Sequence, residues 1–393
     1  MTRARHVSPL LALAALVAVA ALASSTASAA GKPIVIGYPT DLKGNMAPFD
    51  GPALAAAKLE IAKINAKGGV NGRPLRIITC DTQNSNPAKS KACAASLIGK
   101  GAVIGMVTCD VEFAAPATQE FISHGMLAVA PCIGTDQMGP KRFGPRGKLA
   151  FSFGNVAQDE GAAMAEWAYK QKRWRTAALA TNNLLIYFKN VVQAFKQRFT
   201  ELGGKIVAEE SYTTGQNDVG NAVSRLNGVK ADVIVTSTSF GELPGLVSGL
   251  RSLGNETPIL NSWAGDGTYW VTKSPKVTNY YAVTYASVAG DDPSPAVNTL
   301  AKQVKAATGG FVTGAAAIDG IVAAIKRAKG STDGAKLAAQ MERFKKVPTI
   351  SGLVSFSKRF HSVFGRQYRV IEIQDNVLKR VGLVTASSPA NIG

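Results

Sequence analysis

The chain has 393 residues, which is more than one ordinary hydrophobic core needs and enough for two domains. Apolar residues make up 46% of the chain and the formal charge at pH 7 is +18, a composition that excludes a long disordered tail. The basic residues are scattered and no module of interleaved aromatic and basic residues occurs, so a solvated basic surface is favoured over a nucleic-acid partner.

The first thirty residues are typical of a secretory signal peptide. Arg3 and Arg5 precede an unbroken apolar run at 10–23, and Ala-Ser-Ala at 27–29 fits a cleavage site. The run is too short for a membrane helix, which needs about 20 residues. No cysteine follows the run directly, so we expect removal of residues 1–30 and export of a mature protein without a lipid anchor.

Continuous apolar runs follow along the chain, and helical patterns separate them. Such runs are expected for strands covered on both faces of a parallel sheet. In the first series, the expected strands begin at residues 34, 75, 103, 127 and 149, and the expected helices cover 50–67, 87–100 and 114–124.

The same alternation then starts again. In this second series, the expected helices cover 157–171, 187–202, 217–227 and 241–253, and the expected strands begin at residues 176, 205, 231, 258 and 280. Alternating strands and helices predict an α/β fold with parallel sheets, and two similar series predict two Rossmann-like lobes.

Two similar joins mark the ends of helices in the two series. Gly68-Gly69 and Gly203-Gly204 each follow a helical pattern and precede an apolar run. Glycine adopts the left-handed conformation that ends a helix without a Cβ penalty. Asn86-Pro87 has the residue types that are favoured at a helix start.

The order of elements changes near the C-terminus. Helices at 293–307, 314–329 and 333–345 have little strand between them, and short strands follow near 353–357, 368–374 and 377–383. This order suggests that the chain returns to the first lobe after about residue 286 and crosses again near 349.

The four cysteines are Cys80, Cys93, Cys109 and Cys132. An even number in an exported protein predicts two disulfides, for which three pairings are possible. We favour Cys80–Cys93, which joins a strand end to the following helix, and Cys109–Cys132, which joins the ends of two successive strands. Buried free thiols are the alternative, and no pair has the short spacing of a zinc site.

The stretch GNMAPFDGPALAAAKLEIAKINAKGGVNGRPLRI resembles the start of the type I periplasmic binding proteins that serve branched-chain amino acid transporters. Residues 43–47 stand at the family's Ser-Gly-x-x-Ala motif, and residues 64–72 match its Ile-Asn-Ala-x-Gly-Gly motif. CDTQNSNPAKSKACAASLI is also similar to a family segment. The similarity extends over almost the whole mature chain.

This resemblance implies two lobes joined by three crossover strands, which close on a small molecule in the periplasm and deliver it to a membrane ABC permease. With the order of elements above, we expect an N-terminal lobe of residues 31–153 and 287–348 and a C-terminal lobe of residues 154–286 and 349–393. The protein is expected to be a monomer without cofactor or metal. Ligands of such folds bind beyond the carboxyl ends of strands, and hinge closure buries them.

In the first lobe, Asp110 follows an expected strand where the family commonly has a serine or another small polar residue. A carboxylate there would attract an amine and repel an anion. A cap for the following helix is the alternative reading of Asp110. Phe49 matches an aromatic residue that forms a wall of the family's pocket, with a core position as its alternative.

The next strand end has Cys132, Ile133, Gly134 and Thr135. The family uses backbone amides and a threonine hydroxyl here, but Gly134 stands where that threonine is expected and Thr135 comes one place later. Backbone contacts from Cys132 and Ile133 survive this change, because main-chain groups do not depend on the side chain.

In the second lobe, Tyr187 and Phe240 match family aromatic residues near the ligand. The family's amine-binding acidic residue falls on Ala264, and Asp266 is the nearest carboxylate. Asp266 is therefore the expected cation partner, with an Asp-Gly turn as its alternative. Trp263 is either a further aromatic wall or a core residue.

Two carboxylates with several aromatic residues predict a ligand that has an amine and an apolar or aromatic body. An enzyme is disfavoured, because His124 and His361 stand beside no nucleophile motif and no Gly-x-Ser-x-Gly occurs. An exported sensor of amides or amines, docking on a membrane receptor, is the alternative function.

Overall fold

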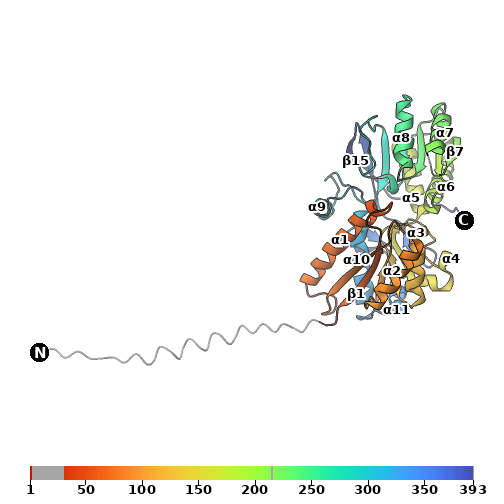
Figure 1. The fold of residues 1–393 in the computed structure, drawn as a ribbon. Helices are drawn as coiled ribbons and strands as arrows, with labels where there is room; N and C mark the ends of the chain where they lie inside the picture. The colour runs from red at the N-terminus through yellow and green to blue at the C-terminus, as the bar shows by residue number, and fades with distance from the viewer. Residues whose placement is uncertain (2–30, 214–215, 393) are drawn as a thin grey trace.

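The computed structural model describes Met1, residues 31–213 and residues 216–392. Residues 2–30 of the predicted signal peptide lie outside the described residues. Within them, no helix is both long enough and apolar enough to span a membrane. The polypeptide forms two halves, each with a sheet between helices, and Figure 1 shows one half above the other.

The first sheet contains six strands in the order β13-β5-β4-β3-β1-β2, and its neighbouring strands are parallel. Its strands are β1 (Ile34–Thr40), β2 (Leu75–Asp81), β3 (Ile104–Met106), β4 (Leu127–Ala130), β5 (Ala150–Asn155) and β13 (Ser362–Val363). The expected α/β class with parallel sheets is confirmed.

The helices of this half come from two separate parts of the chain. They are α1 (Ala47–Ala66), α2 (Pro87–Gly99), α3 (Val111–Ser123), α4 (Pro140–Phe143), the 3-10 helix η1 (Gly144–Leu149), α10 (Phe311–Arg327) and α11 (Gly334–Met341). Helix α10 packs along α1, and residues of both join the first-lobe core. The late helical segment therefore lies on the first sheet.

The second sheet contains seven strands in the order β15-β14-β10-β9-β8-β6-β7. Its strands are β6 (Thr176–Asn182), β7 (Lys205–Tyr212), β8 (Val233–Ser237), β9 (Ile259–Asn261), β10 (Tyr280–Thr284), β14 (Tyr368–Gln374) and β15 (Val377–Val384). Strands β14 and β15 are antiparallel, and they extend an otherwise parallel sheet at one edge.

The main helices of this half are α5 (Ala157–Glu166), α6 (Ile186–Glu201), α7 (Gln216–Asn227) and α8 (Glu242–Ser252). Shorter elements complete the chain: the π-helical η2 (Trp167–Gln171), the 3-10 helix η3 (Trp263–Gly265), α9 (Pro295–Val304), and the strand pair β11 (Val347–Thr349) and β12 (Gly352–Val354).

The helix boundaries follow the local signals in the sequence. Helix α1 ends before Gly68, which has a positive φ of 91°, and α6 ends before Gly203, with a φ of 97°. The side chain of Asn86 accepts a hydrogen bond from the backbone N–H of Lys89 at 3.0 Å, and Pro87 begins α2. These helix ends are where the sequence predicts them.

The last crossing between the halves comes later in the chain than residue 349. Val354, Phe356 and Val363 belong to the first-lobe core, and β13 pairs with β5. The chain then enters the second sheet at Tyr368. We therefore move the proposed second boundary of the lobes to residues 364–367, because strands as short as β11, β12 and β13 have no periodic pattern that assigns them to a lobe.

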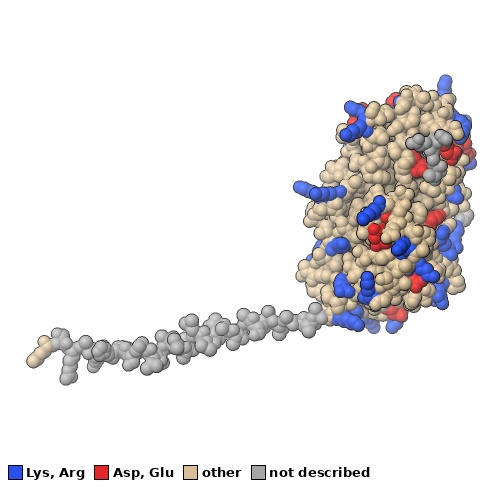
Figure 2. Space-filling view, viewed as in Figure 1, with Lys and Arg blue, Asp and Glu red and all other residues tan. Residues whose placement is uncertain are grey.

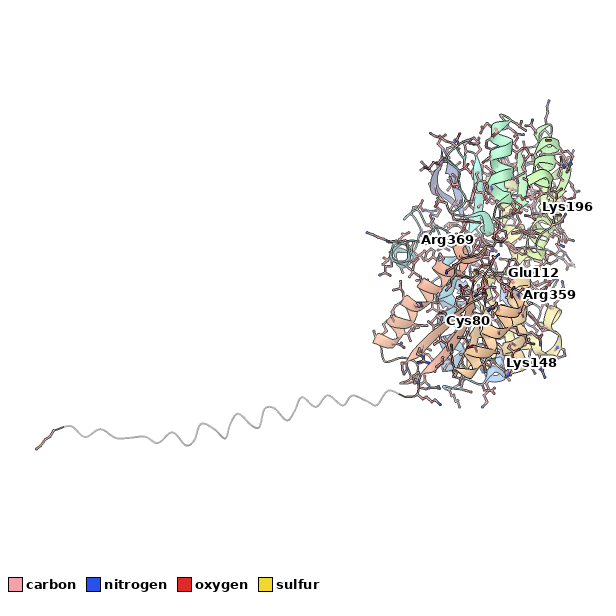
Figure 3. All side chains as sticks on the ribbon, in the orientation of Figure 1. Cys80, Glu112, Lys148, Lys196, Arg359 and Arg369 are labelled. Carbon is pink, nitrogen blue, oxygen red and sulfur yellow. A yellow bond between two sulfur atoms is a disulfide. The ribbon has the colours of Figure 1, made fainter. Side chains whose placement is uncertain are left out.

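Two disulfides link the cysteines as the sequence favours, Cys80 with Cys93 and Cys109 with Cys132. The first joins β2 to α2, and Cys80 is labelled in Figure 3. The second joins the segments that follow β3 and β4. It therefore ties together two strand ends that face the other half.

Candidate functional site

An aromatic cluster joins the two halves of the molecule. The ring of Phe49, on α1, lies 5.4 Å from that of Trp263, 5.4 Å from that of Tyr269 and 6.4 Å from that of Phe240. The last three residues follow β8 and β9 of the second sheet. The sequence predicts Phe49, Phe240 and Trp263 at one site, and the structure brings their rings together.

Phe240 has a strained backbone within this cluster. Its φ is +53°, in the left-handed region that bulky residues seldom adopt. The ring contacts Phe188 at 6.3 Å as well as Phe49. Strain of this kind persists where the surroundings hold it, and it is frequent at ligand sites.

Tyr187, near the start of α6, packs directly on the first lobe. A Cβ atom placed on Gly134 would lie only 2.5 Å from Cε2 of Tyr187. The same ring lies 6.0 Å from that of Trp263. The absence of a side chain at Gly134, where the resemblance leads one to expect threonine, is what lets the phenol approach.

Asp110 acts as the N-cap of α3. Its carboxylate accepts hydrogen bonds from the backbone N–H groups of Glu112, at 2.9 Å, and Phe113, at 3.3 Å. Burial, and then the neighbouring charge of Glu112, raise its pKa well above the usual range. These hydrogen bonds belong to the helix-cap reading of Asp110, and its expected role as an amine ligand stays a prediction.

Glu112 bridges the two halves, although it is not among the site residues that the sequence predicts. Its Oε1 accepts a hydrogen bond of 3.3 Å from the backbone N–H of Ile186, at the start of α6. Its Oε2 is buried and has no hydrogen-bond partner among the described residues. Figure 3 shows Glu112 close to the junction of the halves.

The residues that follow β4 make two kinds of contact: some pack in the aromatic cluster, and others make hydrogen bonds within the first lobe. Cys132 is buried in the same apolar cluster as Phe49. The carbonyl of Ile133 accepts from the Ser152 hydroxyl at 2.7 Å. The Thr135 hydroxyl accepts from the backbone N–H of Gln137 at 3.3 Å. The polar contacts of Ile133 and Thr135 are thus made within the first lobe.

Asp266 links the end of β10 to the start of α10. Its Oδ2 accepts from the Thr284 hydroxyl and, at 2.8 Å, from the backbone N–H of Gly309. Its Oδ1 is buried without a hydrogen-bond partner among the described residues. Burial raises the pKa of Asp266 to about 7. Its expected role as a cation partner stays a prediction.

Glu160, on α5, is a second carboxyl that is not among the site residues predicted from the sequence. Oε1 accepts from the backbone N–H of Trp263 at 2.7 Å, and Oε2 accepts from the Tyr187 hydroxyl at 2.9 Å. Burial raises its pKa to about 8, helped by the charges of Asp159 and Asp266. A signal was present, because Glu160 follows the carboxyl end of β5.

Buried polar groups tie the three crossing segments together. The backbone N–H of Asn155 donates to the Tyr285 hydroxyl at 3.1 Å, and that of Gly365 donates to the Asp159 carboxylate at 3.0 Å. The Arg366 guanidinium donates to the Phe153 carbonyl at 2.7 Å and lies 5.0 Å from the ring of Tyr285. The three crossing segments are therefore joined by an ordered network beside the aromatic cluster, where the ring of Tyr285 lies 5.2 Å from that of Trp263.

Arg369 and Asp292 form a further buried pair in this region. The guanidinium of Arg369 donates to both carboxylate oxygens, at 2.8 and 3.0 Å. Arg369 is labelled near the junction in Figure 3. The pair joins β14 to the segment that follows β10.

The geometry suits the enclosure of a small organic molecule. Aromatic faces from both halves offer apolar contact and attraction for a cation. Buried carboxyls beside these rings would lower the energy of an ammonium group in the same space. Phe49 and Gly134 on one half and Tyr187 and Trp263 on the other can separate only if the halves move apart.

Comparison with known proteins gives one family. Residues 33–377 match the model of a family described as periplasmic binding protein. The chain is 26% identical, over 341 residues, to the Leu/Ile/Val-binding protein homolog 3 of Brucella melitensis. That alignment covers 84% of this chain and 89% of the relative.

Solved structures of the same architecture are similar to this one. The branched-chain amino acid transporter substrate-binding protein LivJ of Streptococcus pneumoniae, in complex with isoleucine, has a TM-score of 0.76 at 18% identity, covering 90% of this chain and 99% of that one. An ABC transporter solute-binding protein of Rhodopseudomonas palustris, in complex with 3,4-dihydroxybenzoic acid, has a TM-score of 0.74 at 18% identity, covering 91% and 98%. At such identities the likeness concerns the fold.

Proposed function

This chain belongs to the periplasmic binding protein family, and from that premise we propose that it captures a small solute between its lobes in the periplasm and delivers it to an ABC importer. The family consists of binding proteins rather than enzymes. The observation that carries the proposal is the aromatic cluster, in which Phe49 of one lobe meets Trp263 of the other at the carboxyl ends of the strands.

The proposed solute has an amine and an apolar or aromatic body. Its support is the chemistry of the cluster, where buried carboxyls lie beside aromatic rings that come from both lobes. Similar proteins bind isoleucine or dihydroxybenzoic acid. A micromolar complex needs about −8 kcal/mol of binding free energy.

The partner is proposed to be the membrane permease of an importer, with the protein acting as a monomer. Lys and Arg side chains are spread over both halves of the visible face in Figure 2, among Asp and Glu. This scatter favours a generally basic, solvated surface and no nucleic-acid partner.

Binding and lobe closure are tested together by a thermal-shift screen of amines, amino acids, amides and aromatic acids, followed by X-ray scattering. A ligand that binds only the folded state raises the melting temperature by mass action. We expect an amine to give the largest rise and to reduce the radius of gyration. A ligand that binds without any change in scattering would contradict capture by closure.

Reconstitution with the permease separates transport from sensing. Uptake of the bound solute into vesicles that requires this protein supports delivery to an importer. Binding of the solute without any contribution to uptake would favour an exported sensor instead.

A further inference from the structure

Glu160 is a buried carboxyl, and both of its hydrogen-bond donors belong to residues whose rings form the aromatic cluster. The backbone N–H of Trp263 and the hydroxyl of Tyr187 donate to its two oxygens. Both donors belong to residues that touch the first lobe, Trp263 at Phe49 and Tyr187 at Gly134. Glu160 therefore lies immediately behind the surface on which the lobes close.

The donors of the two predicted carboxylates are held more firmly. Asp110 is bound by two backbone N–H groups at the start of its own helix. Asp266 is bound by the Thr284 hydroxyl and by the backbone N–H of Gly309. A backbone donor cannot leave without disturbing its helix or turn, so Oδ1 of Asp110 and Oδ2 of Asp266 keep at least one donor. Oδ1 of Asp266 has no hydrogen-bond partner among the described residues, so Asp266 is the competing acceptor for a cation.

The donor to Oε2 of Glu160 is the hydroxyl of a residue that lies on the contact between the lobes. Tyr187 needs only a change of side-chain rotamer to withdraw it, and its ring loses the contact at Gly134 once the lobes separate. Separation of the lobes therefore frees Oε2 of Glu160 to accept a hydrogen bond from an N–H group of the solute in place of the Tyr187 hydroxyl. Oε1 stays bound to the Trp263 backbone and keeps the carboxyl in position.

The charges around Glu160 favour a cation as the replacement. Its acidic neighbours are Asp159 and Asp266, and both raise its pKa. The buried guanidinium of Arg366 donates instead to the Phe153 carbonyl. An ammonium group at Oε2 would pair with a carboxylate that is otherwise costly to ionise in this buried place.

We propose that Glu160 is the specificity-determining residue for the solute and binds its ammonium group through Oε2 in place of the Tyr187 hydroxyl. The rings of Tyr187 and Trp263 then lie against the carbon body of the solute. This inference rests on the proposed function, and it assigns the cation to a residue other than Asp110 or Asp266.

The test is isothermal titration calorimetry with phenethylamine and isoamylamine, and with phenethyl alcohol and isoamyl alcohol as their neutral counterparts. We expect Glu160→Gln to weaken amine binding by about 30-fold, the usual scale for losing a charged hydrogen bond, and to change alcohol binding by less than about threefold. Glu209→Gln, which changes an exposed carboxyl paired with Lys196, is the matched control and should keep amine binding within about threefold.

Tyr187→Phe supplies an independent readout that does not depend on the Glu160 variant. Removing the competing hydroxyl should tighten amine binding by about threefold to tenfold and leave alcohol binding unchanged. Thermal melts of each variant show whether it is folded at the temperature of the titration.

Three results would overturn the inference. Amine binding by Glu160→Gln at the wild-type level would remove the ionic role of Glu160. A loss of amine binding in Tyr187→Phe would show that the hydroxyl itself contacts the solute. Binding of the alcohols but of neither amine by the wild-type protein would contradict the amine part of the proposed function as well.

Discussion

At the scale of single residues, the lobe junction depends on very close contacts. Gly134 and Tyr187 approach so closely that no side chain fits between them, and Glu160 holds the hydroxyl of the same tyrosine. A side chain added at Gly134, or a change in the protonation of Glu160, is therefore expected to alter the contact between the lobes.

Gly134→Thr should weaken ligand binding by displacing the ring of Tyr187. The threonine Cβ would lie 2.5 Å from that ring, so either the ring or the lobe must move. We expect affinity to fall by about tenfold or more, on the scale of one lost aromatic contact, in calorimetry with a ligand found by the screen.

Gly220→Ala is the matched control, since a Cβ at Gly220 meets nothing within 4 Å and the residue lies within α7. It should leave affinity unchanged and stabilise the helix by up to about 1 kcal/mol. Equal affinities in all three proteins would show that the Gly134 contact plays no part in closure.

The pKa of Glu160 predicts how stability changes with pH. Burial raises this pKa to about 8 from an ordinary value of 4.5. The contribution of the protonated carboxyl is present in full below about pH 4.5 and is lost as the pH rises toward 8, because only the unfolded state ionises in that interval. The buried carboxyls of Asp159 and Asp266 act in the same direction.

Glu160→Gln should therefore gain stability relative to the wild type between pH 5 and pH 8. The upper limit is about 4 to 5 kcal/mol for a shift of this size. Denaturant unfolding at both pH values measures it. Glu166 has a pKa lowered to about 2 and should change stability only as the pH falls below 4.5, so it does not disturb the comparison. A difference that does not vary with pH would contradict the raised pKa.

At the scale of elements, the two disulfides have different neighbours. Cys80–Cys93 joins β2 to α2, whereas Cys109–Cys132 ties the ends of β3 and β4 inside the apolar cluster that contains Phe49. Both close short loops, but only the second positions chain segments at the lobe junction.

Replacing both cysteines of either bridge by serine should cost about 3 kcal/mol of unfolding free energy in the chain-entropy model. Only the Cys109/Cys132 replacement should also weaken ligand binding, because it frees two strand ends beside the cluster. Each replacement is the control for the other, in denaturant unfolding and calorimetry. Equal affinities in the two proteins would show that the bridge at the junction has no role in the site.

At the scale of the whole molecule, buried polar contacts hold the crossing segments in order. The Arg369–Asp292 pair is nearly inaccessible, with side chains 9% and 0% exposed. An exposed pair, Lys196–Glu209, has side chains 46% and 54% exposed, and Lys196 is labelled in Figure 3. The buried pair is therefore screened far less by solvent than the exposed pair.

Asp292→Ala should destabilise the protein by about 3 to 5 kcal/mol, because it leaves a buried guanidinium without its partner. Lys196→Ala, which breaks the exposed pair, should cost less than about 1 kcal/mol. Denaturant unfolding compares the two variants. A loss in Asp292→Ala no larger than that in Lys196→Ala would show that the crossing does not depend on the pair.

The sequence by itself determined the order of the elements. Continuous apolar runs, the glycines after α1 and α6, and Asn86-Pro87 are local signals, and each acts within a few neighbouring residues. The expected cysteine pairs also came from this order, since strand ends of one parallel sheet meet at the same edge. Such features need no knowledge of the distant chain.

Only the tertiary structure decided which groups meet between the lobes. Glu160 and Glu112 each follow the end of a strand, but their partners Trp263 and Ile186 are distant in sequence, and no local pattern identifies those contacts. The proposed crossing after β13 has no local signal for a similar reason, because a strand of two residues is specified by its partner β5. Contacts between remote segments depend on how the lobes pack, and a local pattern carries no information about that packing.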